Sequence, residues 1–109
     1  MVLGGDVHSF WLNNVIADFD DPRSKIVASE VVTSCLASRT GPAALFDGAG
    51  SRNPHIRYHD NAHAGYALLD VMPERIDVDL RAVTSLVEPA ARCFSLERRS
   101  IEAGRPGFA

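Results

Sequence analysis

The chain has 109 residues, of which 46% are hydrophobic and 23% charged, a balance that is typical of folded domains and excludes an intrinsically disordered chain. A net charge of −3 argues against a nucleic-acid partner, because nucleic-acid-binding domains usually carry a basic stripe. No apolar run reaches the roughly 20 residues of a membrane span, so we expect no membrane partner. The length predicts one domain over residues 1–109, and Cys35 and Cys93 predict two buried thiols rather than a disulfide framework.

The first half of the chain predicts short strands joined by turns. Val2-Leu3 is apolar and predicts a short buried strand that leads into two glycines. Residues 9–17 are ambiguous, because their apolar positions fit helical spacing and strand spacing equally well. A turn at residues 20–24 precedes residues 26–36, which are rich in β-branched side chains and predict a central strand. Residues 40–53 predict a loop with room for one helical turn at residues 43–46.

The second half has the clearest strand pattern. Residues 55–60 and 65–71 predict two strands, separated by a turn at Asp60-Asn61. After a turn at residues 72–74, Ile76, Val78 and Leu80 alternate with charged residues, which indicates an antiparallel strand with one buried face. Residues 92–101 predict a last strand, followed by a tail over residues 104–107. The fold class is therefore mainly β (α+β), a mostly antiparallel sheet with few short helices.

The chemically most informative segment is residues 5–11, Gly-Asp-Val-His-Ser-Phe-Trp, which follows the first predicted strand. A strand that ends in Gly-Asp-x-His brings a carboxylate and an imidazole to one place, and both groups bind hard and borderline metal ions. Glycine lets the backbone bend sharply at this point. Asp6 and His8 are therefore candidate metal ligands. The motif alone leaves open an exposed Asp-His turn that binds no metal.

The motif is one of several blocks that occur in the order of a known family. These blocks are residues 5–11, 18–22, 28–34, 53–58, 65–66 and 73–75. Together they resemble the C-terminal part of the alkaline phosphatase D (PhoD-like) family, metal-dependent phosphomonoesterases and phosphodiesterases of the calcineurin-like metallophosphatase superfamily. The resemblance covers about residues 2–107, nearly the whole chain.

The resemblance implies a fold and a chemistry. The chain would form part of one sheet of a layered α/β/β/α sandwich, in an enzyme that hydrolyses a phosphate ester with a metal-activated water. His8 would be a metal ligand, with Asp6 a second ligand or the partner that orients His8. Calcium and iron are the metals associated with the family. Complete members are often exported, but nothing in the sequence predicts the localisation of this chain.

The resemblance also suggests two substrate-pocket residues. Trp11 would wall the pocket, and the alternative is a tryptophan buried in the core. His55 belongs to an Asn-Pro-His block and would lie near the phosphate, and the alternative is a structural histidine at the start of a strand.

The family's earlier ligand motifs are absent from these 109 residues, which contain no Gly-Asp-x-x-Asp and no Gly-Asn-His. A catalytic centre needs at least three protein ligands per metal ion, and only two candidates match here. Phosphoester hydrolysis is therefore predicted for the complete enzyme, and the isolated chain is expected to be inactive. The alternative function is a non-catalytic sheet module that associates with itself or with the missing N-terminal part.

Three histidines offer a rival metal site. His55, His59 and His63 are spaced by four, which on a helix would stack three imidazoles suited to zinc or nickel. A proline before the set and Asp60-Asn61 within it favour a strand instead. On that strand His55 and His59 share a face, and His63 lies beyond a turn.

An incomplete sandwich predicts self-association. We expect the face of Val27, Val31, Ile76, Val78 and Leu80 to stay exposed, because a second sheet would cover it in the complete fold. Unpaired strand edges add a second reason to associate. The sequence therefore predicts a homodimer that packs sheet on sheet. The alternative is a monomer in which residues 40–53 fold over this face.

Overall fold

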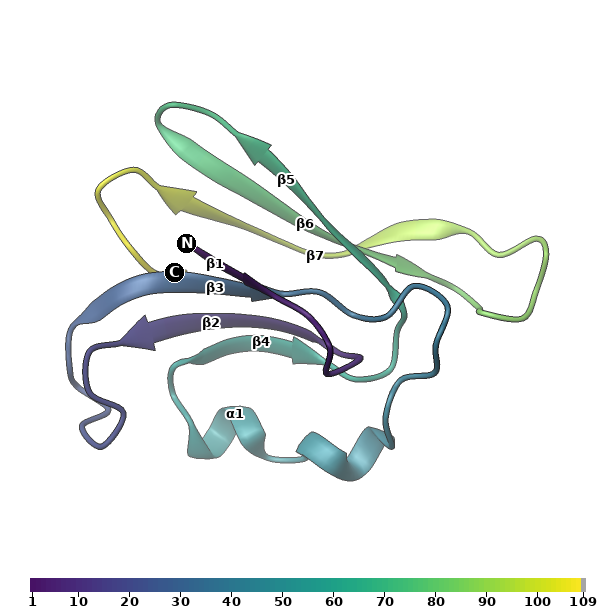
Figure 1. The fold of residues 1–109 in the computed structure, drawn as a ribbon, viewed down its shortest axis with the longest axis horizontal. Helices are drawn as coiled ribbons and strands as arrows, with labels where there is room; N and C mark the ends of the chain where they lie inside the picture. Colours follow the sequence, from purple (N-terminus) through teal and green to yellow (C-terminus); the bar gives the residue numbers. More distant parts are fainter. Residues whose placement is uncertain (109) are drawn as a thin grey trace.

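A computed structural model describes residues 1–108 as two β-sheets packed against each other (Figure 1). The four-stranded sheet has the order β1-β3-β2-β4, and the three-stranded sheet has the order β5-β6-β7. The strands are β1 (Val2–Gly4), β2 (Phe10–Ile16), β3 (Ile26–Val32), β4 (Ile56–Asp60), β5 (Gly65–Val71), β6 (Arg75–Val83) and β7 (Cys93–Glu102). A 3-10 turn η1 (Ala43–Phe46) and a one-turn helix α1 (Ala49–Arg52) follow β3. The mainly β fold with few short helices is confirmed.

The pairing is antiparallel except at one edge. β1 pairs in parallel with β3, whereas β2 pairs antiparallel with β3 and β4, and β6 pairs antiparallel with β5 and β7. The prediction of a mostly antiparallel arrangement therefore holds. The expectation that the chain forms part of only one sheet is wrong, because the chain leaves the first sheet after β4 and builds a second one from β5 onward.

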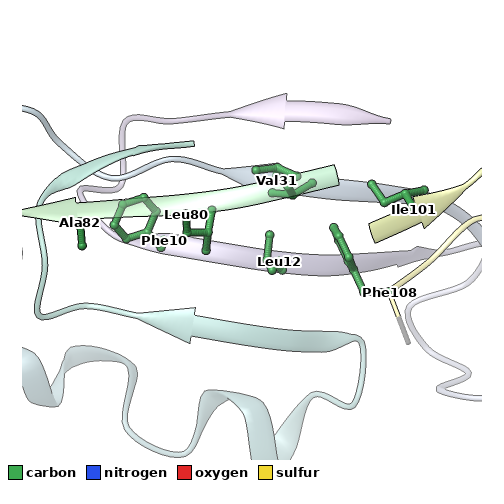
Figure 2. Packing of buried hydrophobic residues seen from close by; sticks show 8 residues of the cluster. Phe10, Leu12, Val31, Leu80, Ala82, Ile101 and Phe108 are labelled. Carbon is green, nitrogen blue, oxygen red and sulfur yellow. The ribbon is translucent and has the colours of Figure 1, made fainter. Parts of the chain in front are cut away.

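The core lies between the two sheets (Figure 2). Phe10, Leu12 and Val31 from the four-stranded sheet pack with Val78 and Leu80 from β6, and all five are almost completely buried. Burial of each such side chain contributes roughly 2 kcal/mol. The period of two in β6 is explained by this contact, because every second residue of the strand faces the opposite sheet.

The expected exposure of one apolar face is wrong. Val31, Val78 and Leu80 are buried and Ile76 is partly buried, because the chain supplies both sheets itself. Val27 is 51% exposed for a local reason: Val15 pairs with Ala28 and Ile16 with Ile26, so Val27 is the extra residue of a β-bulge. The oligomeric state stays a prediction, and this face gives it no support.

Residues 9–17, whose sequence fits a helix and a strand equally well, contain the strand β2. It lies between β3 and β4, and both neighbours supply hydrogen-bonding partners that a helix could not use. Phe10 and Leu12 face the second sheet, while Trp11 points to the other side and meets Phe46 of η1. The expected helical turn at residues 43–46 is therefore present as η1. Among residues 1–108, no helix is long and apolar enough to cross a membrane.

Two expectations of burial are wrong. β1 is an edge strand, so Val2 and Leu3 are 45% and 61% exposed rather than buried. Both cysteines are free, but only Cys35 is buried, and Cys93 is exposed at the first residue of β7.

The segment after β7 closes one end of the core. The Phe108 side chain is buried, and its backbone N–H donates to Asn14 Oδ1 at 2.7 Å. The Gly107 N–H donates to Ser29 Oγ at 2.8 Å. Residues 107 and 108 are therefore tied to β2 and β3, and the segment expected to be a tail is part of the packed structure.

The chain passes from the four-stranded sheet to the three-stranded sheet just before β5, and the close packing at this point depends on Gly65, the first residue of β5. Its φ is 156°, and a Cβ at this position would overlap the Arg81 carbonyl group and the Ala82 Cα. We expect Gly65→Ala to lower the free energy of unfolding by about 3 kcal/mol or more, because backbone atoms of β6 would have to move. Urea denaturation followed by circular dichroism measures the loss.

Gly104→Ala is the matched control. Gly104 also has a positive φ of 74°, but no atom lies within 4 Å of the added Cβ. We expect only the backbone strain of about 1 kcal/mol. Equal losses of stability in the two variants would contradict the claim that position 65 has no room for a Cβ beside the backbone of β6.

Candidate functional site

The turn between β1 and β2 carries the two residues that the sequence singled out. Asp6 and His8 both have left-handed backbone angles, with φ of 74° and 55°, and within residues 1–108 no other non-glycine residue has a positive φ. Such a conformation costs a side-chain-bearing residue about 1 kcal/mol or more. Strain of this kind is concentrated at ligand-binding and catalytic sites. The turn is therefore the strongest candidate for function on structural grounds as well.

The His8 imidazole is held in one orientation. Its Nδ1 lies 2.9 Å from the backbone carbonyl oxygen of Arg39, in the loop after β3. A carbonyl oxygen can only accept, so Nδ1 carries a proton, and in the neutral form of the imidazole Nε2 keeps its lone pair. The side chain is partly exposed. Metal-binding histidines are usually fixed in this way, with one ring nitrogen donating to a carbonyl or carboxylate and the other facing the ion.

The turn offers only part of a metal centre. Asp6 is exposed and adds one carboxylate to the His8 imidazole. Within the described part of the chain, no three histidine, cysteine, aspartate or glutamate side chains gather closely enough to hold an ion. The residues present thus fit one side of a metal site, and further donors would have to come from elsewhere.

Trp11 lies in a packed environment under η1. Its indole N–H donates to Ser9 Oγ at 2.7 Å, and its ring stacks on His59 with centroids 5.0 Å apart. The Phe46 ring meets it edge-on at 4.8 Å. These contacts match the interpretation of Trp11 as a buried tryptophan. Its assignment to a substrate pocket stays a prediction.

His55 lies far from the Asp6–His8 turn. Its carbonyl accepts the Asn14 N–H at 2.8 Å, and its ring meets Phe19 edge-on at 5.2 Å. Asn14 lies four residues beyond Phe10, the first residue of β2, so about 13 Å of strand separates the contact with His55 from the end of β2 that follows the Asp6–His8 turn. The structure does not bring His55 together with Asp6 and His8. The assignment of His55 to the phosphate pocket stays a prediction.

The three histidines spaced by four occupy three different environments. His59 stacks on Trp11, and His55 contacts Phe19. His63 Nδ1 lies 3.1 Å from the Asp60 carboxylate. β4 (Ile56–Asp60) confirms a strand rather than a helix here, although His55, expected on that strand, lies in the turn before it. No three-histidine cluster forms among residues 1–108.

The Asp60–His63 pair was not found from the sequence, because its Asp-x-x-His spacing was interpreted as a turn. Asp60 accepts from the His63 backbone N–H and from its ring, which fixes the turn after β4. The His63 ring also meets Phe94 edge-on at 5.6 Å.

Burial, with the carboxylates of Asp60 and Glu97 nearby, raises the pKa of Tyr58 to about 12, so this phenol stays neutral at physiological pH.

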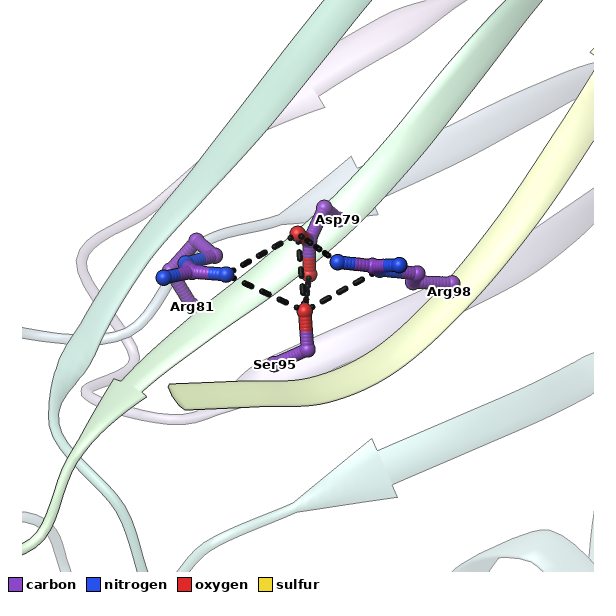
Figure 3. A network of polar contacts seen from close by, with 4 residues as sticks. All are labelled: Asp79, Arg81, Ser95 and Arg98. Atoms are coloured by element: carbon purple, nitrogen blue, oxygen red, sulfur yellow. Dashed lines mark hydrogen bonds and ion pairs between the residues drawn. The ribbon is translucent and has the colours of Figure 1, made fainter. Parts of the chain in front are cut away.

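A second charged cluster lies on the outer face of the three-stranded sheet (Figure 3). Asp79 accepts from Ser95 Oγ at 2.6 Å and pairs with Arg81 and Arg98, each at 3.3 Å. Burial favours a higher pKa for Asp79, but the Ser95 hydrogen bond and the Arg98 charge outweigh it and hold that pKa below its usual range. A hollow of about 610 Å³ adjoins the cluster. Among the residues that line it, Arg75 pairs with Asp77 and Arg98 pairs with Asp79, so we assign the hollow no ligand.

Comparisons with known proteins agree on one family. The model of the family described as PhoD-like phosphatase matches residues 1–80. The chain is 35% identical over 94 residues to alkaline phosphatase D of Bacillus subtilis (strain 168), covering 84% of this chain and 16% of that protein. A solved structure titled "Structure of PhoD" superposes with a TM-score of 0.81 at 28% identity, covering 99% of this chain and 21% of that one. The chain thus spans about a sixth to a fifth of the length of these relatives.

The Arg39 contact predicts an unusual histidine tautomer. Free neutral histidine favours the proton on Nε2, whereas we expect the His8 proton on Nδ1, because the Arg39 carbonyl accepts it. Long-range ¹H–¹⁵N NMR at about pH 9, where histidine is ordinarily neutral, distinguishes the two forms. A His8 proton found on Nε2 would show that the Arg39 carbonyl does not fix the imidazole, and that the ring is not oriented to bind a ligand through Nε2.

The Asp79 cluster predicts a pH-dependent stability. We expect Asp79→Asn to lower the free energy of unfolding by roughly 1–3 kcal/mol at pH 7, because a charge-assisted hydrogen-bond acceptor is lost. Since the folded-state pKa of Asp79 lies below the ordinary value of 3.8, its contribution is complete above that pH and disappears as the pH falls through the folded-state pKa. Denaturation curves between pH 2 and 7 measure this difference.

Asp77→Asn serves as the control, because Asp77 lies on the same face of β6 and also has one arginine and one serine partner, Arg75 and Ser100, but at a more exposed position. We expect a loss of about 0–1 kcal/mol there. Equal losses at positions 77 and 79, or a loss at Asp79 that persists in acid, would contradict the electrostatic role of the cluster.

Proposed function

The chain belongs to the PhoD-like phosphatase family and corresponds to a C-terminal part of its fold, and on this basis we propose that it supplies one side of a metal-dependent phosphoester-hydrolysing site. The substrates would be phosphate monoesters or diesters, attacked by water. The activity belongs to the complete site, and this chain contributes the Asp6–His8 turn to it.

The observation that carries the proposal is the fixed orientation of the His8 side chain. The imidazole is fixed by the Arg39 carbonyl with Nε2 free, and the strained turn that presents it also carries the Asp6 carboxylate. A turn with no ligand would gain stability from glycine at these positions, because glycine adopts a positive φ without steric cost. Side chains kept in spite of that cost indicate a role beyond folding.

The donor types suit the metals of the family. His8 would bind through Nε2, and Asp6 would offer a hard oxygen donor, which calcium and iron both accept. Bound metal ions polarise phosphoryl oxygens and lower the pKa of a coordinated water. The contribution of this chain is to hold the imidazole and the carboxylate in place before the ion arrives. The remaining ligands would come from the preceding part of the fold.

A non-catalytic sheet module is the second candidate. It is favoured by the closed core, since the two sheets, with Phe108 at one end, already bury the apolar faces without any further part of a phosphatase. The two candidates differ in one respect, because only the first requires metal at Asp6 and His8.

The incomplete ligand set predicts that the isolated chain lacks appreciable phosphatase and phosphodiesterase activity. Two protein donors bind metal weakly and leave a hydroxide unpositioned. The assay uses a chromogenic phosphate monoester and a diester, each with added calcium, iron, manganese or zinc. Wild type and His8→Ala should give the same background rate. Robust turnover that disappears in His8→Ala would show that the chain is a complete catalyst by itself.

A further inference from the structure

Three connecting segments meet at one end of the four-stranded sheet (Figure 1). They are the Asp6–His8 turn before β2, the loop of residues 33–42 after β3, and the turn of residues 60–63 after β4. The His8 imidazole contacts this loop through the Arg39 carbonyl oxygen. Any group that fixes the position of this carbonyl therefore also fixes the orientation of the imidazole.

The part of the loop that carries Arg39 lies on the surface. The side chains of residues 36–39 are all exposed, and Leu36 is 72% exposed. Exposed loops with few buried contacts are the segments of a fold that move most easily. Packing of its own side chains therefore does not hold the Arg39 carbonyl in place, and hydrogen bonds must do so.

Two side-chain hydrogen bonds hold the loop, one on each side of Arg39. Before it, the Cys35 thiol donates to the Ser38 carbonyl oxygen at 2.9 Å. After it, Asn61 Nδ2 donates to the Pro42 carbonyl oxygen at 2.6 Å. A thiol is a weak donor, whereas an amide N–H is a good one. The Asn61 contact is therefore the stronger of the two.

Asn61 itself has a fixed position. Its side chain is 7% exposed. The turn that carries it is closed by Asp60, whose carboxylate accepts the backbone N–H groups of Ala62 and His63. Asp60 also pairs with the first residue of β2, the strand that follows the Asp6–His8 turn. The amide thus extends from a rigid part of the fold to the exposed loop.

The amide of Asn61 is present at a cost in stability. Its Oδ1 is buried and has no hydrogen-bond partner among the described residues. A buried acceptor without a partner destabilises a fold, and such a group in a native protein calls for an explanation. An apolar side chain of similar size would avoid this cost but could not donate to the Pro42 carbonyl. The explanation therefore lies in the donor, Nδ2.

We propose that Asn61 is a positioning residue for His8. Its amide fixes the loop at Pro42, and the fixed loop holds the Arg39 carbonyl against His8 Nδ1, which leaves Nε2 to a metal ion. The role rests on the proposed function, in which His8 binds metal through Nε2. Asn61 acts only through the backbone of the loop and the His8 ring, and it contributes no donor to the ion.

The test is the tautomer of His8 in Asn61→Leu, because leucine is similar in size but has no donor. Long-range ¹H–¹⁵N NMR at about pH 9, where histidine is ordinarily neutral, gives the ratio of the Nδ1–H form to the Nε2–H form. We expect this ratio to fall roughly five-fold or more from its wild-type value, the factor that corresponds to the loss of one neutral hydrogen bond. A folded Asn61→Leu chain with the wild-type ratio would overturn the proposal.

Asn13→Leu is the matched control. Asn13 also donates through Nδ2, to Glu30 Oε2 at 2.8 Å, and its Oδ1 is likewise buried without a partner in the described part of the chain. Both residues lie on strands, Asn13 on β2 and Glu30 on β3, so the loop after β3 is not involved. We expect the wild-type ratio at His8. Equal shifts in Asn13→Leu and Asn61→Leu would overturn the proposal, because they would report a general loosening of the fold.

A second variant and a measurement on wild type keep the test independent of how well leucine fits. Asn61→Ala removes the same donor without adding bulk, and we expect the same fall in the ratio. In wild type, backbone ¹⁵N order parameters of residues 38–42 should match those of the strands, because both ends of this segment are held. A mobile segment 38–42 in the wild-type chain would overturn the role of Asn61 without any substitution.

Manganese(II) separates this inference from the proposed function. It binds oxygen and imidazole donors, and as a paramagnetic ion it broadens the NMR signals of its ligands even when binding is weak. We expect millimolar manganese to broaden the His8 signals of wild type. A tautomer that depends on Asn61, without broadening at His8, would sustain the positioning role and overturn the proposed function. Broadening at His8, with the wild-type ratio in Asn61→Leu, would do the reverse.

Discussion

The packing of β6 on the four-stranded sheet is the contact on which the rest of the structure depends. Val78 and Leu80 fill the space above Leu12 and Val31, and neither sheet could keep its apolar face out of water alone. This contact is possible only because the chain crosses at Gly65, where a Cβ would meet the backbone of β6. Once the sheets are closed, β2 is fixed between its neighbours, and the turn before it is held in a strained conformation.

The strained turn and the open edge are two parts of one arrangement. The folded core fixes the turn between β1 and β2, and the loop after β3 reaches across to hold His8 through the Arg39 carbonyl. The resulting imidazole is ready for a ligand, but the described residues gather too few donors to complete a metal centre. β1, which leads directly into the turn, is also the strand that lacks a neighbour. The incomplete set of donors and the open edge of β1 therefore lie at the same corner of the molecule.

Much of the fold could be predicted from local patterns. The alternation in β6 and the turns around β5 follow from periodicity and from turn-forming residues, and the Gly-Asp-x-His motif located the strained turn. Burial could not be predicted in the same way. Val2 and Val78 are both apolar strand residues, yet one lies on an edge and the other in the core, and only the order of strands distinguishes them. The bulge at Val27 escaped prediction because a bulge is defined by the register of the partner strand.

The sequence by itself determined the family, the mainly β class and the identity of the two candidate ligands, since these depend on residue types and their spacing. Only the tertiary structure decided that the chain packs two sheets against each other and that His55 lies toward the other end of β2 from His8. It also decided that Nδ1 of His8 forms a hydrogen bond with a backbone carbonyl group. The carbonyl belongs to the backbone of Arg39, 31 positions away, and any residue there would provide it. Backbone contacts over such distances leave no trace in side-chain patterns, because every residue type carries the same carbonyl group.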